Sequence, residues 1–340
     1  MINFGIIGFG LHAVKRLMPG FEKAANCRVT ALSRREMSKA RESAQLYNIP
    51  NAFSSAKDLC QSPEVDAVLV TTPNSCHFPD VMTAIECGKP VLCEKPMAVS
   101  AEECRQMVQA AQKANLLLGI AQVFRFNESI RRIKDRVAAG QIGTPVLARS
   151  EFSFPVGPEH PRAWINDPKV AGGGPISDVG VHCIDTLRFI LQDEVVRVSS
   201  VATSDTLSGE QEATAAITLE FSRGTLGSVF VSFRTEYRTT LEIVGTSGVL
   251  RADNGLTVDR PVNIQLHQEG DSVETETVSN SLAYARQVDS FAAAVEGKGI
   301  FPVPGEEGWK NQLILDAAYR AIKRGRIEGV GQINGNQPSP

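Results

Sequence analysis

Three polar residues, Asp178, His182 and Asp185, follow a run of three glycines at intervals of four and three positions. In a helix this spacing places all three side chains on one face, about one turn apart. An imidazole exchanges protons near neutral pH, and a nearby carboxylate can orient it or accept a hydrogen bond from a ligand. We therefore expect a helix with a catalytic face, and we expect the glycines to let the backbone pass close to ligands.

A lysine at the end of a predicted strand is the second chemical candidate. The apolar residues 91–93 precede Glu94, Lys95 and Pro96. An ammonium group there can donate a hydrogen bond to a substrate oxygen and stabilise negative charge that develops on it. The alternative is a surface lysine before a turn proline. We also expect a cis bond before Pro96 that orients Lys95.

The glycine-rich segment near residue 10 indicates a dinucleotide site. Gly8, Gly10 and Ala13 form a G-x-G-x-x-A pattern between an apolar strand and a helical pattern. The first glycine permits a tight turn and the second lets a pyrophosphate approach the backbone. The alanine lets the helix pack on the strand. A plain glycine turn is the alternative, and the strand before and helix after favour the dinucleotide.

The end of the second predicted strand bears on the type of dinucleotide. An acidic residue about twenty positions after the glycines usually binds the ribose 2′-hydroxyl group of NAD. This chain has Ser33, Arg34 and Arg35 there, and hydroxyl and guanidinium groups suit a 2′-phosphate. We therefore expect NADP(H), with NAD(H) as the alternative. The alternative for the two arginines is a solvated loop that does not bind the cofactor.

Apolar strands and helices alternate from residue 4 to residue 121, which predicts a doubly wound parallel sheet of the Rossmann type. Ligands of such sheets lie at the carboxyl ends of the strands. We expect the cofactor to be bound there by Gly8, Phe9, Gly10, Leu11, His12, Ser33, Arg34, Arg35, Thr71, Thr72, Pro73, Asn74, His77, Glu94 and Lys95.

The second half of the chain has longer, partly alternating strands. They are expected at 146–154, 198–201, 212–221, 225–234, 239–244 and 249–252, with helices at 127–139, capped by Asn127, at 283–295 and at 308–324. Phe230 could line a subunit interface or belong to the core. We predict a cofactor domain at 1–122, a substrate-binding and oligomerisation α/β domain at 123–330, and a disordered tail at 331–340.

Composition excludes several classes of protein. The 340 residues carry a net charge of −3, which gives no electrostatic footprint for nucleic acid. The sequence has no apolar run long enough to span a membrane and no signal peptide. Its seven cysteines lack the spacing of a metal site. We therefore expect a cytoplasmic protein with reduced thiols and without a metal, nucleic-acid or membrane partner.

Several of these motifs, in this order, resemble the Gfo/Idh/MocA family of glucose–fructose oxidoreductase, inositol dehydrogenase and rhizopine catabolism. The resemblance covers nearly the whole chain. It rests on Gly8-x-Gly10, Thr72-Pro73-Asn74…His77, Glu94-Lys95-Pro96 and Gly173-Gly174…Asp178-x-Gly180-x-His182-x-x-Asp185, with support from 122–126, 140–143 and 245–248.

This resemblance implies a Rossmann domain followed by an α/β domain with a large, open, mostly antiparallel sheet. One face of that sheet often forms the oligomer interface in the family, so a homodimer or homotetramer is expected. Family members mostly oxidise or reduce sugars, polyols and cyclitols. By position, Lys95 corresponds to the lysine of the EKP motif, and Asp178 and His182 to the acid and histidine of the catalytic motif.

Two further residues complete the expected substrate site with Asp178 and His182. The position of segment 159–168 in the family suggests a pocket wall, with Trp164 or Arg162 near the cofactor or sugar. A packed loop tryptophan is the alternative. Arg125 could face the pocket or form a structural ion pair.

The expected reaction is a reversible hydride transfer between a nicotinamide and a carbon that bears a hydroxyl or ketone group. His182 acts as general base in oxidation and as acid in reduction, Lys95 binds the substrate oxygen, and Asp178 orients the imidazole or the sugar. The alternatives are an NAD-dependent glycosidase that oxidises its substrate transiently, and a dinucleotide-binding regulator without activity. A regulator would have no use for Lys95, Asp178 and His182.

Overall fold

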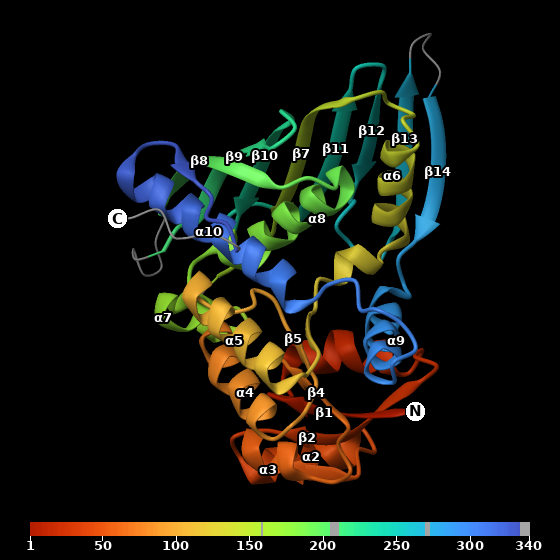
Figure 1. Ribbon diagram of the computed structural model, residues 1–340, viewed down its shortest axis with the longest axis vertical. Coiled ribbons are helices and arrows are strands. Elements are labelled where there is room, and N and C mark those ends of the chain that lie inside the picture. Colours follow the sequence, from red (N-terminus) through yellow and green to blue (C-terminus); the bar gives the residue numbers. More distant parts are fainter. Residues whose placement is uncertain (158, 205–210, 269–272, 334–340) are drawn as a thin grey trace. The chain divides into compact units, whose positions relative to one another are not determined.

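The computed structural model describes residues 1–157, 159–204, 211–268 and 273–333, which form two compact units (Figure 1). The first unit contains Met1–Gln122 and Tyr284–Gln312, and the second contains Val123–Ala283 and the described part of Leu313–Pro340. The division after Gln122 falls where the sequence suggested it. Residues 284–312, which we assigned to the second domain, instead cluster with the first unit. Most of the expected tail, 334–340, lies outside the described residues.

The first unit contains the expected doubly wound parallel sheet of six strands, in the order β3-β2-β1-β4-β5-β6. The strands are β1 (Ile2–Ile7), β2 (Cys27–Ser33), β3 (Asn51–Phe53), β4 (Ala67–Val70), β5 (Val91–Cys93) and β6 (Leu118–Ile120). Its helical segments are the π-helical turn η1 (Ala13–Leu17), α1 (Met18–Phe21), α2 (Met37–Leu46), α3 (Ala56–Gln61), α4 (Asn74–Glu86), α5 (Ala101–Ala114), α9 (Ala283–Val295) and the start of α10 (Gly305–Arg324). The sequence missed only β3 among these strands, because it is short and half-buried.

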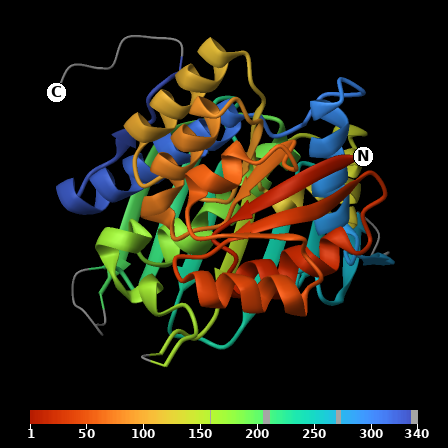
Figure 2. The same cartoon turned by 90° about the horizontal axis from the view of Figure 1, so that it is seen from below.

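Helices cover both faces of this sheet, as Figure 2 shows from below. On one face the ring of Phe4 packs against Phe21 of α1 and Phe291 of α9, with centroids 5.3 and 6.0 Å away. On the other face, a Cβ added to Gly5 would lie 2.5 Å from Leu59 Cδ2 of α3. Strands buried on both faces need apolar residues throughout, which explains the apolar runs in the sequence.

Local signals explain two helix boundaries. Ser100 caps α5 by accepting a hydrogen bond from the Glu103 N–H at 3.3 Å, and Glu103 Oε2 accepts one from the Val99 N–H at 3.2 Å. Pro19 lies in the first turn of α1, where a proline is tolerated, and the helix continues to Phe21.

The second unit is built on a nine-stranded sheet in the order β14-β13-β12-β11-β7-β10-β9-β8-β15. Among these pairs only β7 and β10 run parallel, so the sheet is mostly antiparallel, as expected. Its strands are β7 (Pro145–Ser153), β8 (Val195–Thr203), β9 (Thr214–Phe221), β10 (Leu226–Ser232), β11 (Arg238–Gly245), β12 (Gly248–Asp253), β13 (Pro261–Gln268), β14 (Val273–Ser279) and β15 (Glu328–Gly329). The last three strands, β13, β14 and β15, were not expected from the sequence.

The helical segments of this unit are the short turns η2 (Val123–Phe126), η3 (Ala163–Asn166), α7 (Pro168–Ala171) and η4 (Ile176–Gly180), the helices α6 (Glu128–Ala138) and α8 (Val181–Leu191), and the end of α10. Helices α6 and α8 pack against one face of the sheet (Figure 1). Asn127 occupies the N-cap position of α6 but forms no side-chain cap hydrogen bond, and its side-chain amide donates to the Thr257 carbonyl at 3.0 Å.

The opposite face of β8, β9 and β10 bears exposed apolar side chains. Phe230 is 52% exposed, and Val201 and Leu226 are exposed as well. Phe230 is therefore not a core residue, and its alternative role in an interface stays a prediction. No helix in the described part of the chain is long and apolar enough to cross a membrane.

Phe291→Ala should lower the free energy of unfolding in urea by about 3–5 kcal/mol, because Phe291 is fully buried between the first sheet and Phe301. The control Leu46→Ala removes a side chain that is 70% exposed and should change it by less than about 0.5 kcal/mol. Equal effects of the two substitutions would contradict the placement of α9 in the core of the first unit.

Candidate active site

The glycine turn after β1 leaves room for a ligand. Gly8 has φ +81°, and a Cβ there would lie 2.5 Å from Thr72 Cγ2 and 2.8 Å from its backbone nitrogen. Thr71 Oγ1 donates a hydrogen bond to the Gly8 carbonyl at 2.8 Å. At Gly10, an added Cβ would meet only the Gly8 oxygen, 3.6 Å away, among the described residues. The turn is therefore packed at Gly8 and open at Gly10, which fits a pyrophosphate.

The glycine turn is joined directly to the strand end that bears the lysine. His12 Nε2 lies 2.9 Å from Glu94 Oε1, and Glu94 Oε2 accepts a hydrogen bond from the Lys95 N–H at 3.2 Å. Burial raises the pKa of the Glu94 carboxyl, but His12 and Lys95 outweigh it and the net pKa is lowered. An ionised Glu94 thus connects two segments that are 82 residues apart in the chain.

His77 holds two backbone segments of the same edge together. Its Nδ1 lies 2.8 Å from the Pro96 carbonyl oxygen and its Nε2 lies 2.8 Å from that of Thr72. Burial lowers its pKa, and a neutral imidazole has one N–H, so it donates to one carbonyl at a time. His77 is only 1% exposed, and these contacts give it a role in supporting the two loops. The Lys95–Pro96 peptide bond is cis, as expected, and Lys95 is half-buried.

The remaining cofactor candidates follow the ends of β1, β2 and β4. Phe9 is buried against the ring of Tyr47, and its N–H donates to the Ser33 carbonyl at 3.0 Å. Arg34 Nη1 donates to Ser43 Oγ at 2.8 Å, while Arg35 is exposed. Of the others, Leu11 is exposed, Pro73 immediately precedes α4, and Asn74 is buried at its first position.

The glycine-preceded helix of the second unit begins with a π-helical turn. Asp178 lies in η4, whereas His182 and Asp185 lie in α8. A π turn contains more residues than an α turn, so the regular spacing assumed from the sequence does not hold between Asp178 and His182. Such turns frequently occur at functional sites.

Asp178 is held by an arginine that the sequence analysis mentioned only as a pocket-wall candidate. Arg162 Nη1 and Nη2 donate to the two carboxylate oxygens of Asp178, both at 3.0 Å. Burial alone would lower the pKa of Arg162, but the charge and hydrogen bonds of Asp178 outweigh it and the pKa is raised. The guanidinium also lies 5.8 Å from the ring centroids of Phe154 and Trp164. Trp164 is thus placed beside the arginine that binds Asp178.

His182 lies between two aromatic rings. The Phe124 ring meets it edge-on with a centroid distance of 4.6 Å, and the Phe152 ring is stacked on it at 6.1 Å. His182 is 7% exposed. The two rings fix the plane of the imidazole. The sequence analysis missed both, because they belong to η2 and β7, far from His182 in the chain.

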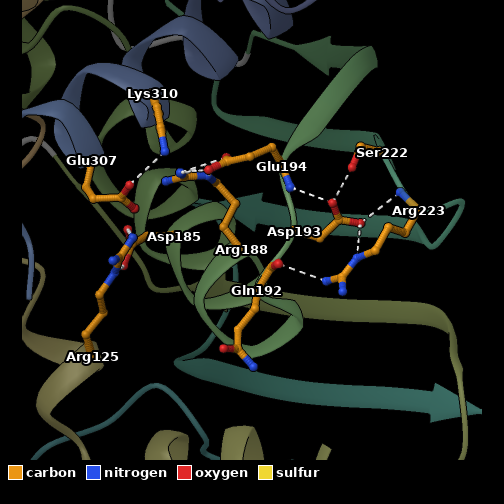
Figure 3. Close-up of polar contacts among 10 residues, drawn as sticks. All are labelled: Arg125, Asp185, Arg188, Gln192, Asp193, Glu194, Ser222, Arg223, Glu307 and Lys310. Atoms are coloured by element: carbon orange, nitrogen blue, oxygen red, sulfur yellow. Dashed lines mark hydrogen bonds and ion pairs between the residues drawn. The ribbon is translucent and has the colours of Figure 1, made fainter. Parts of the chain in front are cut away.

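Arg125 forms the structural ion pair that was one of its two expected roles. Its Nε and Nη2 donate to the two oxygens of Asp185 at 2.9 and 2.7 Å (Figure 3). The two side chains are 6% and 1% exposed. Its guanidinium also lies 5.4 Å from the centroid of the Phe189 ring. This geometry favours a structural role of Arg125 in the packing of α8 over the substrate-binding role.

The far end of α8 is fixed by a second polar cluster (Figure 3). Arg188 donates to both oxygens of Glu194 at 2.8 and 3.0 Å. Arg223 donates to the carbonyl groups of Leu191 and Gln192, which satisfies the open end of the helix. Within the described residues, no group of His, Cys, Asp and Glu side chains is arranged to hold a metal ion.

Arg125→Met should lower the free energy of unfolding by about 3–5 kcal/mol, because it removes the guanidinium from the buried Asp185 carboxylate. The double variant Arg125→Met/Asp185→Leu should recover most of this loss, since neither charge then remains buried. Urea unfolding measures both effects. An Arg125→Met protein with unchanged stability but a weakened affinity for substrate would instead restore the substrate-binding role.

Comparisons with known proteins identify a family for both parts of the chain. A family model described as an oxidoreductase family with an NAD-binding Rossmann fold matches residues 2–122. A model of the GFO/IDH/MocA C-terminal domain matches residues 130–251.

Three proteins illustrate the similarity. A 1,5-anhydro-D-fructose reductase of Ensifer adhaerens is 31% identical over 310 residues, which cover 91% of this chain and 92% of that protein. The D-xylose 1-dehydrogenase (NADP(+)) 2 of Haloferax volcanii is 31% identical over 327 residues, covering 95% and 98%. The crystal structure of aldose-aldose oxidoreductase from Caulobacter crescentus superposes with a TM-score of 0.89 at 25% identity, covering 96% and 99%. With its glycine turn, its EKP segment and its mostly antiparallel second sheet, this chain belongs to the Gfo/Idh/MocA family of NAD(P)-binding oxidoreductases.

Proposed function

We propose that this oxidoreductase transfers a hydride between NADP(H) and a carbon of a sugar, polyol or cyclitol that bears a hydroxyl or ketone group. The observation that carries the proposal is the contact between His12 of the glycine turn and Glu94, the residue before Lys95. It joins a turn suited to a pyrophosphate to a strand end that carries a cationic hydrogen-bond donor. The names of the two relatives, an anhydrofructose reductase and a xylose dehydrogenase, support a sugar as the substrate.

Lys95, His182 and Asp178 each have a separate chemical role in this proposal. A bound nicotinamide supplies the hydride acceptor or donor. Lys95 donates a hydrogen bond to the substrate oxygen and stabilises negative charge on it. His182 accepts the hydroxyl proton in oxidation and returns it in reduction. Asp178 binds Arg162 with both oxygens, which favours the ionised carboxylate. It can then accept hydrogen bonds but not donate them, so proton transfer falls to His182.

The residues at the end of β2 favour NADP(H) in the proposal. The hydrogen bond from Arg34 to Ser43 holds its guanidinium group in place, and Ser33 provides a hydroxyl in place of the acidic residue that NAD enzymes carry. Both groups suit a phosphate on the ribose. The cofactor named for the Haloferax volcanii relative is NADP(+).

Assembly and compartment complete the proposal. The exposed apolar side chains of Val201, Leu226 and Phe230 suit burial against a second copy, as a homodimer or homotetramer. All seven cysteines are free thiols, which supports a reducing compartment such as the cytoplasm.

Lys95→Ala and His182→Ala should each lower kcat by about a hundredfold or more, with cofactor affinity retained, because each removes a group that acts on the substrate oxygen. Turnover is measured over a panel of sugars, cyclitols and keto-sugars, and cofactor affinity by nicotinamide fluorescence. The controls Lys113→Ala and His267→Ala change the same residue types on α5 and β13 and should leave kcat unchanged. Near-normal turnover of both site variants would contradict the catalytic roles of Lys95 and His182. Cleavage of a chromogenic glycoside without net cofactor turnover would indicate a glycosidase.

The enzyme should prefer NADP(H) to NAD(H), and Arg34→Ala should reduce that preference by about tenfold or more, because it removes a charge-assisted contact with the 2′-phosphate. The measurement is kcat/KM for both cofactors. Arg41→Ala changes an exposed arginine of the same helix region, α2, and should leave the preference unchanged. Equal or better turnover of the wild type with NAD(H) would overturn this interpretation.

A further inference from the structure

A buried polar network surrounds the three glycines of the second unit and was not expected from the sequence. The Tyr319 hydroxyl donates a hydrogen bond to Glu212 Oε1 at 2.9 Å and lies 3.0 Å from Ser177 Oγ. The same Glu212 oxygen accepts a hydrogen bond from the Ile176 N–H at 3.0 Å. Ser177 Oγ donates to the Gly172 carbonyl at 3.3 Å. Glu212 is 8% exposed, and burial raises the pKa of its carboxyl.

This network gives a reason for the glycines that differs from the expected one. Gly173 has φ +147°, and a Cβ there would lie 1.9 Å from the Tyr319 hydroxyl. A Cβ on Gly174 would lie 2.0 Å from the Glu212 carbonyl oxygen. The expectation was that the glycines let the backbone approach cofactor and substrate. The structure shows that Gly173 and Gly174 make room for Tyr319 and Glu212, and the approach to ligands stays a prediction.

The network acts at the point where the chain enters the catalytic helix. Ile176 and Ser177 are the first two residues of η4, and Asp178 is the third. The first N–H groups of a helix have no acceptor within the helix, so an outside acceptor determines how its first turn is held. Glu212 is that acceptor for Ile176. The position of Asp178, and of His182 in the helix that continues from it, therefore depends on this contact.

We propose that Glu212 and Tyr319 are positioning residues: they fix the π turn through Ile176 and Ser177 and thereby hold Asp178 and His182 in their working geometry. The inference rests on the proposed function of those two residues. Glu212 and Tyr319 contact neither substrate nor cofactor in it. A displacement of about 1 Å in a reacting group can cost about a hundredfold in rate, so such support has a kinetic effect.

The kinetic test uses Glu212→Ala, which removes the acceptor of the Ile176 N–H, and Tyr319→Phe in the full-length protein. Each should lower kcat about tenfold or more with KM for sugar and cofactor within about threefold, because geometry and not binding is lost. The kcat of the double variant should be little lower than that of the less active single variant, because the two residues act as a unit. Ser177→Ala breaks the same network from the other side and serves if Tyr319→Phe does not fold. The matched control is Glu274→Ala, which removes a carboxylate that is 61% exposed on β14 and should keep the wild-type kcat.

Amide hydrogen exchange tests the inference without relying on turnover. Exchange over residues 174–182 should rise about tenfold or more in Glu212→Ala and Tyr319→Phe, and remain at the wild-type rate in Glu274→Ala. If the wild type turns over no substrate in the panel, the proposed function fails, while faster exchange still supports the positioning role. Unchanged exchange in both variants, an unchanged kcat, a rise in KM alone, or an equal loss of kcat in Glu274→Ala would each overturn the inference.

Discussion

The second unit is arranged around one helix whose charged side chains are buried and must each have a partner. All residues of α8 except Phe189 are buried, yet the helix includes Asp185 and Arg188, and Asp178 lies in the turn before it. A charged group removed from water is stable only with a partner and hydrogen bonds. Each of these residues is paired with a residue from another part of the chain: Asp178 with Arg162, Asp185 with Arg125 and Arg188 with Glu194. The positions of η2, η3 and the α8–β8 connection follow from this requirement.

The first unit meets a different requirement, which is to hold several loops at the ends of parallel strands. Such loops carry few backbone hydrogen bonds of their own, so side chains must connect them. Two histidines do so here. His12 joins the glycine turn to Glu94, and His77 spans the carbonyl groups of Thr72 and Pro96. The sequence analysis assigned both to the cofactor. Their contacts show that they also hold the protein's own loops together.

The parallel sheet could be predicted because strands buried on both faces are marked by apolar runs such as residues 67–70. β14 was missed because it is an edge strand with exposed glutamates, such as Glu274 and Glu276, that read as a loop. The types and spacing of Asp178 and His182 suggest chemistry, and their catalytic roles stay predictions. The Arg162 contact with Asp178 could not be read from local spacing. Gly173 lies against Tyr319, which is almost 150 positions away in the chain, and no local pattern predicts such a contact.

The bidentate pairs along α8 also bear on the electric field of this part of the protein. Each carboxylate is matched by one guanidinium group, so Asp178 with Arg162, and Asp185 with Arg125, carry no net charge. Salt screens interactions between separated net charges, and paired charges at contact distance present only a short-range dipole. A neutral polyol at this helix would therefore be recognised by the directions of hydrogen bonds, and ionic strength would have little influence on its affinity.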